Sequence, residues 1–470
     1  MIWGPWILMA FVGLALVWET RRGERAIERL VQQAEEQGMS LEWSQLNATA
    51  LPPEKNVTLL PMLTNQWDAD RYRATPDLVR LGRQPAGITN EREDVRAPVE
   101  EPLLTAQQDL RLWLEESSRP GDLMEAVREL DRIRDDRRQG LDELAGALQT
   151  KEFQIDYDPS VLLDLNKASL SYLDMLHLAG ACEEDVIFAV HLQDDERALS
   201  RLRIFAKMLG SQEQPVLLSA LVKAAVTSLM LDSVEEILRG LALSDDQLQE
   251  VETLLRASPY DGLPRVVQGE LAFGLVALEE ALAEMNFFED RDLFALIPKG
   301  TYKASWANEA RAVLEALQGL DLSKEPDRLS FEKRLAAEAE ARLPLHDYLG
   351  GTARIISSHL AKVRRIEAQR LLVLTAIALE RYRLSHGVYP EKLSELPVTL
   401  PNDPFSQAPF RYLRKPDGTP HLWSVGPDKV DDKGLPGRGN RGDLVWMTTP
   451  IPGLTPEEWR KATRLSRSGE

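Results

Sequence analysis

The first eighteen residues of the chain contain no charged side chain. As a helix, Met1–Trp18 would extend about 27 Å at 1.5 Å per residue, just enough to cross a thin hydrocarbon core. Trp3, Trp6 and Trp18 lie near the two ends of this run, where the aromatic belts of membrane proteins lie. We therefore predict that residues 1–20 form a single transmembrane anchor for the rest of the chain.

A cleaved signal peptide is the alternative to an anchor. The apolar run ends Leu16-Val17-Trp18-Glu19, and no small-x-small cleavage site follows it, which favours the anchor. Arg21, Arg22 and Arg25 follow the span, whereas no Lys or Arg precedes it. By the positive-inside rule, this pattern places the body in the cytoplasm.

The net charge argues against nucleic-acid binding, and the cysteine count excludes a disulfide and a cysteine-based zinc site. The chain has 75 acidic and 56 basic residues, a net charge of −19, which repels phosphate backbones and disfavours nucleic-acid binding. Cys182 is the single cysteine of the chain, so neither an intramolecular disulfide nor a cysteine-based zinc site can form.

Residues 21–103 combine a short helix with a linker. Apolar residues recur on one face of Arg22–Gln37, which predicts a helix that continues from the anchor. Seven prolines follow between Leu51 and Leu103. Because proline removes a backbone donor and fixes φ, we predict a proline-rich linker with at most short helices.

Residues 104–345 have helical periodicity almost throughout, and strand-like alternation is absent. The predicted helices begin at Gly121 and continue with Val161–Ala181, Glu184–Gln193, Glu196–Leu209, Pro215–Arg239, Ser244–Arg256, Arg265–Met285, Ala304–Leu317 and Phe331–Ala341. Gly240 is expected in a left-handed C-terminal cap, and Ser244 with Gln247 in a capping box. Short connections between these helices predict a solenoid-like array of helical hairpins, and an irregular bundle is the alternative.

Residues 346–450 change in character. The pattern predicts one long buried helix at Ala361–Ser385, followed by short β segments at Phe410–Leu413, His421–Val425 and Leu444–Met447. The predicted fold class is thus mainly α, with an N-terminal transmembrane helix, a helical-hairpin array and a small C-terminal α+β module. Residues 451–470 are assigned to a C-terminal tail.

Three ordered stretches of this module carry a family resemblance. They are the helix end and turn Ala378–Pro390, the segment from Asn402-Asp403-Pro404-Phe405 to Phe410-Arg411-Tyr412, and Trp423–Asp428 with Gly442-Asp443-Leu444 beyond it. Together they resemble the globular domain of the major pseudopilins of type II secretion systems. The whole chain is also similar in plan to long helical bacterial proteins that have one anchor.

The resemblance implies a calcium-binding loop. Asp428 and Asp443 are the ligands that it favours, with Asp431, Asp432 and the carbonyl of Val425 as further oxygen donors. Lys429 replaces a glycine of the family pattern. An acidic turn whose aspartates only cap backbone N–H groups is the alternative. The N-terminus departs from the family, because Met1–Trp18 has neither an early Glu nor a prepilin-peptidase site.

We predict no catalytic residues and no bound organic cofactor. The six histidines form no His-Glu-x-x-His pair, and neither a Gly-x-Ser-x-Gly elbow nor a phosphate-binding loop occurs. The paired acids Glu183-Glu184-Asp185 and Asp194-Asp195-Glu196 are interpreted as helix starts, where carboxylates favour the positive end of the dipole.

The sequence therefore predicts a membrane-anchored, non-enzymatic envelope protein that acts as an interaction scaffold. Its expected partners are proteins, with the membrane bound through the N-terminal helix and no nucleic acid or small-molecule substrate. The alternatives are an accessory component of a type II secretion or pilus-like machine, and a hydrolase with an unrecognised site. We expect the body on the periplasmic side, against the arginine pattern, because a weak calcium loop needs roughly millimolar calcium.

Overall fold

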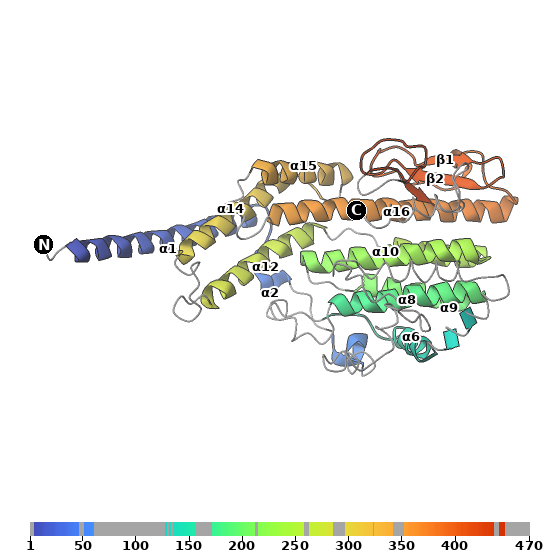
Figure 1. Cartoon of the computed structure of the whole chain (residues 1–470), viewed down its shortest axis with the longest axis horizontal. Helices are drawn as coiled ribbons and strands as arrows, with labels where there is room; N and C mark the ends of the chain where they lie inside the picture. Colours follow the sequence, from blue (N-terminus) through green and yellow to red (C-terminus); the bar gives the residue numbers. More distant parts are fainter. Residues whose placement is uncertain are drawn as a thin grey trace, which may run out of the picture.

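The computed structural model describes residues 4–46, 51–60, 127–128, 131–132, 135–155, 172–211, 215–257, 263–284, 297–322, 324–341, 352–436 and 441–446. Within these ranges the chain forms eleven α-helices and one three-stranded antiparallel sheet, so the mainly α class is confirmed. Most of the helices lie roughly along one long axis, with the N-terminus at one end and the sheet near the other (Figure 1).

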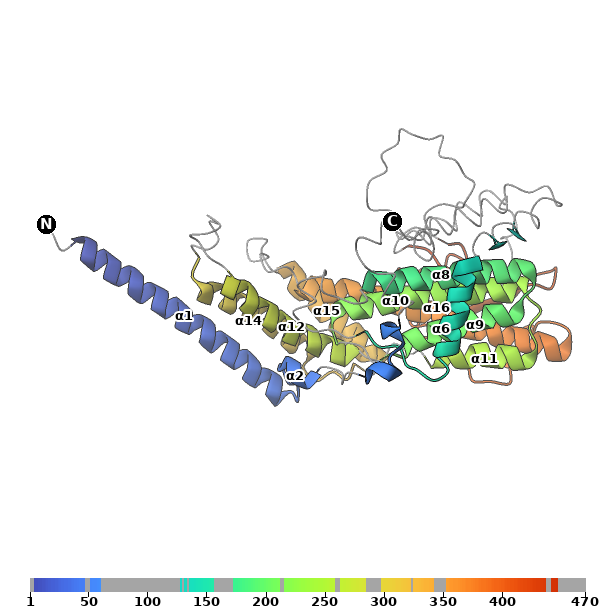
Figure 2. The same cartoon turned by 90° about the horizontal axis from the view of Figure 1, so that it is seen from below.

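Helix α1 (Gly4–Glu36) is continuous from the predicted anchor into the body. As predicted, Leu30 and Ala34 are buried and Ala26 and Val31 pack beside them. The N-terminal part of the same helix projects beyond the body (Figures 1 and 2). The side chains of residues 1–13, which make up most of the predicted anchor, lie outside the described residues.

A first core cluster surrounds the packed half of α1. It is formed with α12 (Leu263–Glu284), α14 (Lys299–Leu317), α15 (Glu325–Ala341) and the first turns of α10 (Leu217–Gly240). The short helix α2 (Trp43–Leu46) packs on α12. Helix α14 begins five residues before the predicted start at Ala304, because Pro298 precedes its first turn and proline is well tolerated where N–H groups lack helical partners.

A second core cluster lies toward the sheet. It contains α6 (Asp135–Ala147), α8 (Tyr172–Leu192), α9 (Asp195–Leu209), most of α10, and α11 (Asp245–Arg256). The first part of the proline-rich linker also belongs here: η1 (Pro53–Lys55) and η2 (Val57–Leu59) dock on residues 152–155, where the Asn56 amide donates to the Gln154 carbonyl at 2.8 Å.

Helix α16 (Thr352–His386) connects the two clusters. Its first turns place Ile356 and Leu360 in the first cluster, and its apolar centre places Leu372 and Ile377 in the second. The predicted burial of this centre is confirmed. The Arg381 guanidinium also binds Asp245 and Glu252 of α11. The core is therefore continuous across residue 345, where the sequence changes character.

The sheet has the order β1 (Arg411–Arg414), β2 (Pro420–Ser424), β3 (Leu444–Trp446), and all pairs are antiparallel. These strands confirm the three predicted β segments to within one or two residues. Leu422 and Trp446 pack into the second cluster beside α16, which explains why β2 is buried along its whole length.

Two local predictions were wrong. Glu184–Gln193 is not a separate helix, because α8 runs unbroken from Tyr172 to Leu192. Gly240 does not form a left-handed cap: it is the last residue of α10, and a Cβ there would lie 2.1 Å from Val190 Cγ1 of α8. Close packing of two helices, not a turn, requires that glycine. The capping box of Ser244 and Gln247 is confirmed.

Several predictions fall outside the described residues. They are the linker over 61–103, the helix start at Gly121, the beginning of Val161–Ala181 and the tail 451–470. Among the described residues, α10 is the helix long and apolar enough to cross a membrane, and 67% of that apolar stretch is buried against the rest of the protein.

Helix α10 offers a matched test of this packing. We predict from the sequence that Leu217, Leu218, Leu221, Val222 and Ala225 form one buried stripe. Leu217 and Val222 are buried, but Leu221 and Ala225 are only half-buried and Leu218 is 42% exposed. Leu217→Ala should lower the free energy of unfolding by about 2–5 kcal/mol, because Leu217 is buried. Leu218→Ala should change it by about 0.5 kcal/mol or less. Equal losses in urea titrations of the two variants would contradict this assignment.

Candidate functional site

The predicted calcium loop is the turn that joins β2 to β3, from Gly426 to Asp443. Asp443 is buried, and its Oδ2 accepts a hydrogen bond from the Gly434 N–H at 2.6 Å. Its Oδ1 is also buried and has no hydrogen-bond partner among the described residues. A buried carboxylate oxygen without a donor is costly, and a bound cation or a proton would relieve that cost.

Asp428 lies next to this carboxylate in the hydrogen-bond network. Its Oδ2 accepts from the Gly442 N–H at 2.9 Å, one residue before Asp443, and its Oδ1 accepts from the Val430 N–H at 3.2 Å. Asp428 is thus bonded to the backbone next to Asp443, so the two favoured ligands lie in one part of the turn. Both carboxylate oxygens of Asp428 already accept backbone N–H groups.

The other predicted ligands have different surroundings. Asp431 accepts from the Trp423 indole N–H at 3.0 Å and binds the Arg411 guanidinium at 3.2 Å. Val425 is buried and its N–H donates to Asp403. Asp432 accepts from the Leu435 N–H through its backbone carbonyl. Among the described residues, no three His, Cys, Asp or Glu side chains form a group that would hold a metal ion.

The electrostatics of the turn centre on Asp443. The pKa of its carboxyl is raised to about 6, mainly by burial and to a smaller extent by the negative charges of Asp431 and Asp432. The backbone N–H groups of Gly434 and Asp432 favour the carboxylate and lower the pKa, but they do not outweigh burial. Burial, together with the charge of Lys415, lowers the pKa of the neighbouring His421 to about 4. At neutral pH the turn therefore holds a buried carboxylate and a neutral imidazole.

Two glycines make this turn possible. Gly426 has a φ of +69°, and a Cβ there would lie 2.3 Å from the Gly442 carbonyl oxygen. Gly434 has a φ of +76°, and a Cβ there would lie 2.0 Å from His421 Nε2. Lys429 also has a left-handed backbone conformation, with a φ of 61°.

Asp403 connects the segment before β1 to the end of β2 through hydrogen bonds. We did not predict this role from the sequence. Asp403 is buried and accepts from the Phe405 N–H at 3.0 Å, the Ser424 hydroxyl at 2.8 Å, the Ser406 hydroxyl at 3.0 Å and the Val425 N–H at 3.3 Å. The Asn402-Asp403-Pro404 turn was the available signal, because an Asp before a proline often binds nearby backbone.

A second polar cluster lies inside the helical body, between α6, α8 and α9. Asp185 of α8 accepts from Arg197 Nε at 3.0 Å and from Arg201 Nε at 2.6 Å, and Arg197 also binds Asp131 at 2.6 Å. Arg137 of α6 pairs with Glu184. Burial opposes the charge of Asp185, but its bonds with Arg197 and the charge of Arg201 hold its pKa below the ordinary value.

This cluster corrects the interpretation of Glu183-Glu184-Asp185 as a helix start. All three residues lie in the middle of α8 and are buried, so Glu184 and Asp185 serve as acceptors for arginines of other helices. For Asp194-Asp195-Glu196 the interpretation is confirmed, because the Asp194 side chain caps α9 by accepting from the Arg197 N–H at 3.1 Å.

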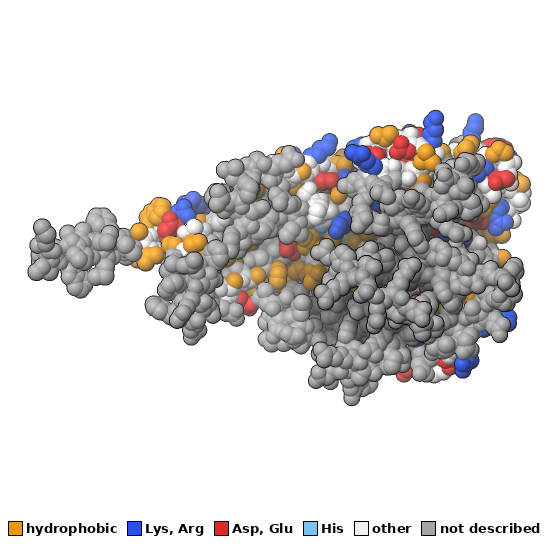
Figure 3. Space-filling view, viewed as in Figure 1, with side chains coloured by type: hydrophobic (Ala, Val, Ile, Leu, Met, Phe, Trp, Pro, Cys, Tyr) orange, Lys and Arg blue, Asp and Glu red, His pale blue; other side chains and the backbone are white. Residues whose placement is uncertain are grey.

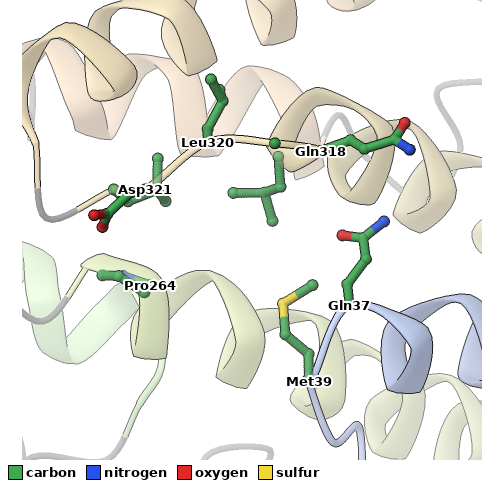
Figure 4. Close-up of a pocket in the computed structure, with 9 residues that line it drawn as sticks. Gln37, Met39, Pro264, Gln318, Leu320 and Asp321 are labelled. Carbon is green, nitrogen blue, oxygen red and sulfur yellow. The ribbon is translucent and has the colours of Figure 1, made fainter.

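A pocket of about 340 Å³ lies where three helices of the first cluster end or begin. Gln37 and Met39 follow α1, Pro264 opens α12, and Gln318 and Asp321 follow α14 (Figure 4). We did not predict this pocket, because its lining residues come from segments more than two hundred residues apart. Most of its lining side chains are apolar, and the amides of Gln37 and Gln318 and the carboxylate of Asp321 lie among them.

Comparison with protein-family models, with curated proteins and with solved structures finds no match to this chain.

Proposed function

We propose that this protein is a membrane-anchored, non-enzymatic scaffold whose helical body carries a pseudopilin-like module. The observation that supports this most is the projecting part of α1. Leu14, Val17 and Trp18 are 67%, 52% and 59% exposed there, on a helix whose next turns are packed in the body. Exposed apolar side chains of this kind mark an interaction surface, and the uncharged run Met1–Trp18 to which they belong is long enough for a thin bilayer.

The space-filling view supports the same proposal. Hydrophobic side chains gather at the narrow neck where α1 leaves the body, with charged side chains beside them (Figure 3). The Arg22 guanidinium lies 5.6 Å from the Trp18 ring centroid, a pairing suited to a membrane interface. The sheet lies near the opposite end of the long axis, where it would be accessible to protein partners (Figure 1).

The accessory role in a type II secretion or pilus-like machine is the second candidate. It is supported by the combination of a long helix, α16, with an antiparallel sheet packed on its C-terminal half and a closed acidic turn. In this role, the module would pack against true pseudopilins. Co-purification with pseudopilins would favour it over a general scaffold.

The anchor is tested by membrane fractionation. The full chain should stay in the membrane pellet after alkaline carbonate extraction, and a chain that begins at Glu19 should be soluble, because the apolar span is absent. Mass spectrometry of the mature full chain should recover the N-terminal residues, which distinguishes an anchor from a cleaved signal peptide. Release of the intact full chain by carbonate would contradict the proposal.

The side of the membrane is tested separately. A phosphatase fused to the C-terminus should be active and a cytoplasmic reporter at the same position inactive, because we propose a periplasmic body. The reverse result would place the body in the cytoplasm, as the arginine pattern indicates. That result would leave the proposed membrane anchor unchanged. It would contradict only the periplasmic location, which we proposed because a weak calcium loop needs roughly millimolar calcium.

A further inference from the structure

The register between α1 and α14 fixes which part of the body lies nearest to the anchor. The two helices run parallel: the Thr301 hydroxyl binds Glu19 at 3.3 Å, Lys303 binds Glu24 at 2.8 Å, and residues after both helices meet at the pocket. Backbone contact secures this register, because a Cβ on Gly300 would lie 2.0 Å from the Glu19 carbonyl oxygen. A Cβ on Gly23 would in turn lie 2.6 Å from Gly300 Cα, so the first turn of α14 is level with the turn of α1 from Glu19 to Gly23.

The end of α12 lies at the same level. The Lys299 ammonium donates to the carbonyl of Leu282 in the last turns of α12, so the beginning of α14 and the end of α12 meet beside α1. Ile297, which precedes α14, is 38% exposed, and Lys299 is exposed next to it. An apolar side chain and a basic side chain are thus exposed at the beginning of α14, the end of that helix that packs beside Glu19.

A simple comparison of lengths places these residues in the lipid headgroup layer. If Met1–Trp18 crosses the hydrocarbon core, Trp18 lies at its boundary, and Glu19 and Thr20 lie about 1.5–3 Å beyond it. The polar layer on each side of a bilayer is roughly 5–8 Å thick. The first turn of α14 must therefore lie within the headgroup layer, because α1 is unbroken and packs directly on α14.

We infer that the α14 end of the body, at Ile297 and Lys299, is a second contact with the lipid bilayer. Ile297 inserts at the headgroup boundary. The Lys299 ammonium gives one N–H to the Leu282 carbonyl and keeps two others for lipid phosphates, while its methylene groups cover apolar surface. This inference rests on the proposed anchor and adds to it: the body is held against the membrane in a fixed orientation, not tethered to it by a flexible segment.

Site-specific fluorescence in lipid nanodiscs tests this contact. The full chain is prepared as Ile297→Cys and, as a matched control, as Glu315→Cys, an exposed site in the last turn of α14, about 24 Å from the start of that helix at Lys299. Each is labelled with an environment-sensitive dye, and quenching by lipids with a nitroxide headgroup is measured. Cys182 should not interfere, because it is buried and burial raises the pKa of its thiol to about 12.

The expected result is quenching at position 297 several-fold stronger than at position 315, with a blue-shifted emission at 297. Equal and weak quenching at both positions, in protein that co-purifies with the nanodiscs, would overturn the second contact and leave the anchor standing. Failure of the full chain to enter nanodiscs would instead overturn the anchor, and the inference with it. The two failures are therefore distinguishable.

Discussion

Asp185→Asn is expected to lower the free energy of unfolding by about 3–5 kcal/mol. The carboxylate of Asp185 accepts from both Arg197 and Arg201, and the Arg201 side chain is 0% exposed. An asparagine removes the carboxylate that the two buried guanidinium groups share and leaves Arg197 with Asp131 and Arg201 with Asp142 alone. Removing one side of a buried ion pair in this way is costly. Chemical denaturation of the full chain, followed by circular dichroism, measures the effect.

The matched control is Asp246→Asn in the exposed first turn of α11, where the loss should be about 0.5 kcal/mol or less. The pH dependence gives a second measure. Because the folded-state pKa of Asp185 is lowered, its contribution is present above the unfolded pKa and is lost as the pH falls through the folded pKa. The difference between native protein and variant should therefore shrink in acid. A loss below about 1 kcal/mol at pH 7 would contradict the role of this cluster.

Asp443→Asn is expected to have the opposite effect, stabilising the calcium-free protein at pH 7 by about 2–3 kcal/mol. The folded-state pKa of Asp443 is about 6, raised by burial from 3.8, and each pKa unit corresponds to about 1.4 kcal/mol. A raised carboxyl pKa means that the folded state binds the proton more tightly than the unfolded state does. The contribution of this carboxyl to stability is therefore greatest below pH 4, falls as the pH rises toward 6, and stays low above it.

Added calcium distinguishes a calcium-binding loop from an acidic turn whose aspartates only cap backbone N–H groups. If Asp428 and Asp443 bind calcium, millimolar calcium should raise the melting temperature of the native chain at pH 7, and magnesium should raise it less. Asp443→Asn should remove the calcium effect while it keeps its own stabilisation. The full chain must be used, because α16 shares its core with α10 and α11. If calcium does not change the melting temperature of the native protein, the turn does not bind calcium, and Asp443 is only a buried carboxyl with a raised pKa.

Local sequence signals were sufficient for most helices and strands. The apolar face of Ala26, Leu30 and Ala34 predicted the packed half of α1, and Ser244 with Gln247 predicted the start of α11. The uncharged centre of α16, too short to span a bilayer, predicted a buried helix. Each of these signals lies within a few residues of the feature that it predicts, because helical hydrogen bonds and caps join near neighbours.

The candidate site was predictable only in part. The Gly- and Asp-rich spacing located the turn, and in the structure Asp428 binds the N–H of Gly442, the residue before Asp443. The burial of Asp443 was not predictable, because His421 and the glycine backbone that enclose it come from two separate segments. The same holds for Asp431, whose partner Trp423 lies on a strand.

The sequence by itself determined the helical character of this protein, its uncharged N-terminal run and its acidic terminal turn. Only the tertiary structure decided that Asp185 is a buried acceptor, that Gly240 allows close packing against Val190, and that α14 begins level with Glu19. The physical reason is the range of the interactions. Periodicity and capping depend on neighbours along the chain, whereas ion pairing and backbone contact depend on partners that folding brings from distant segments.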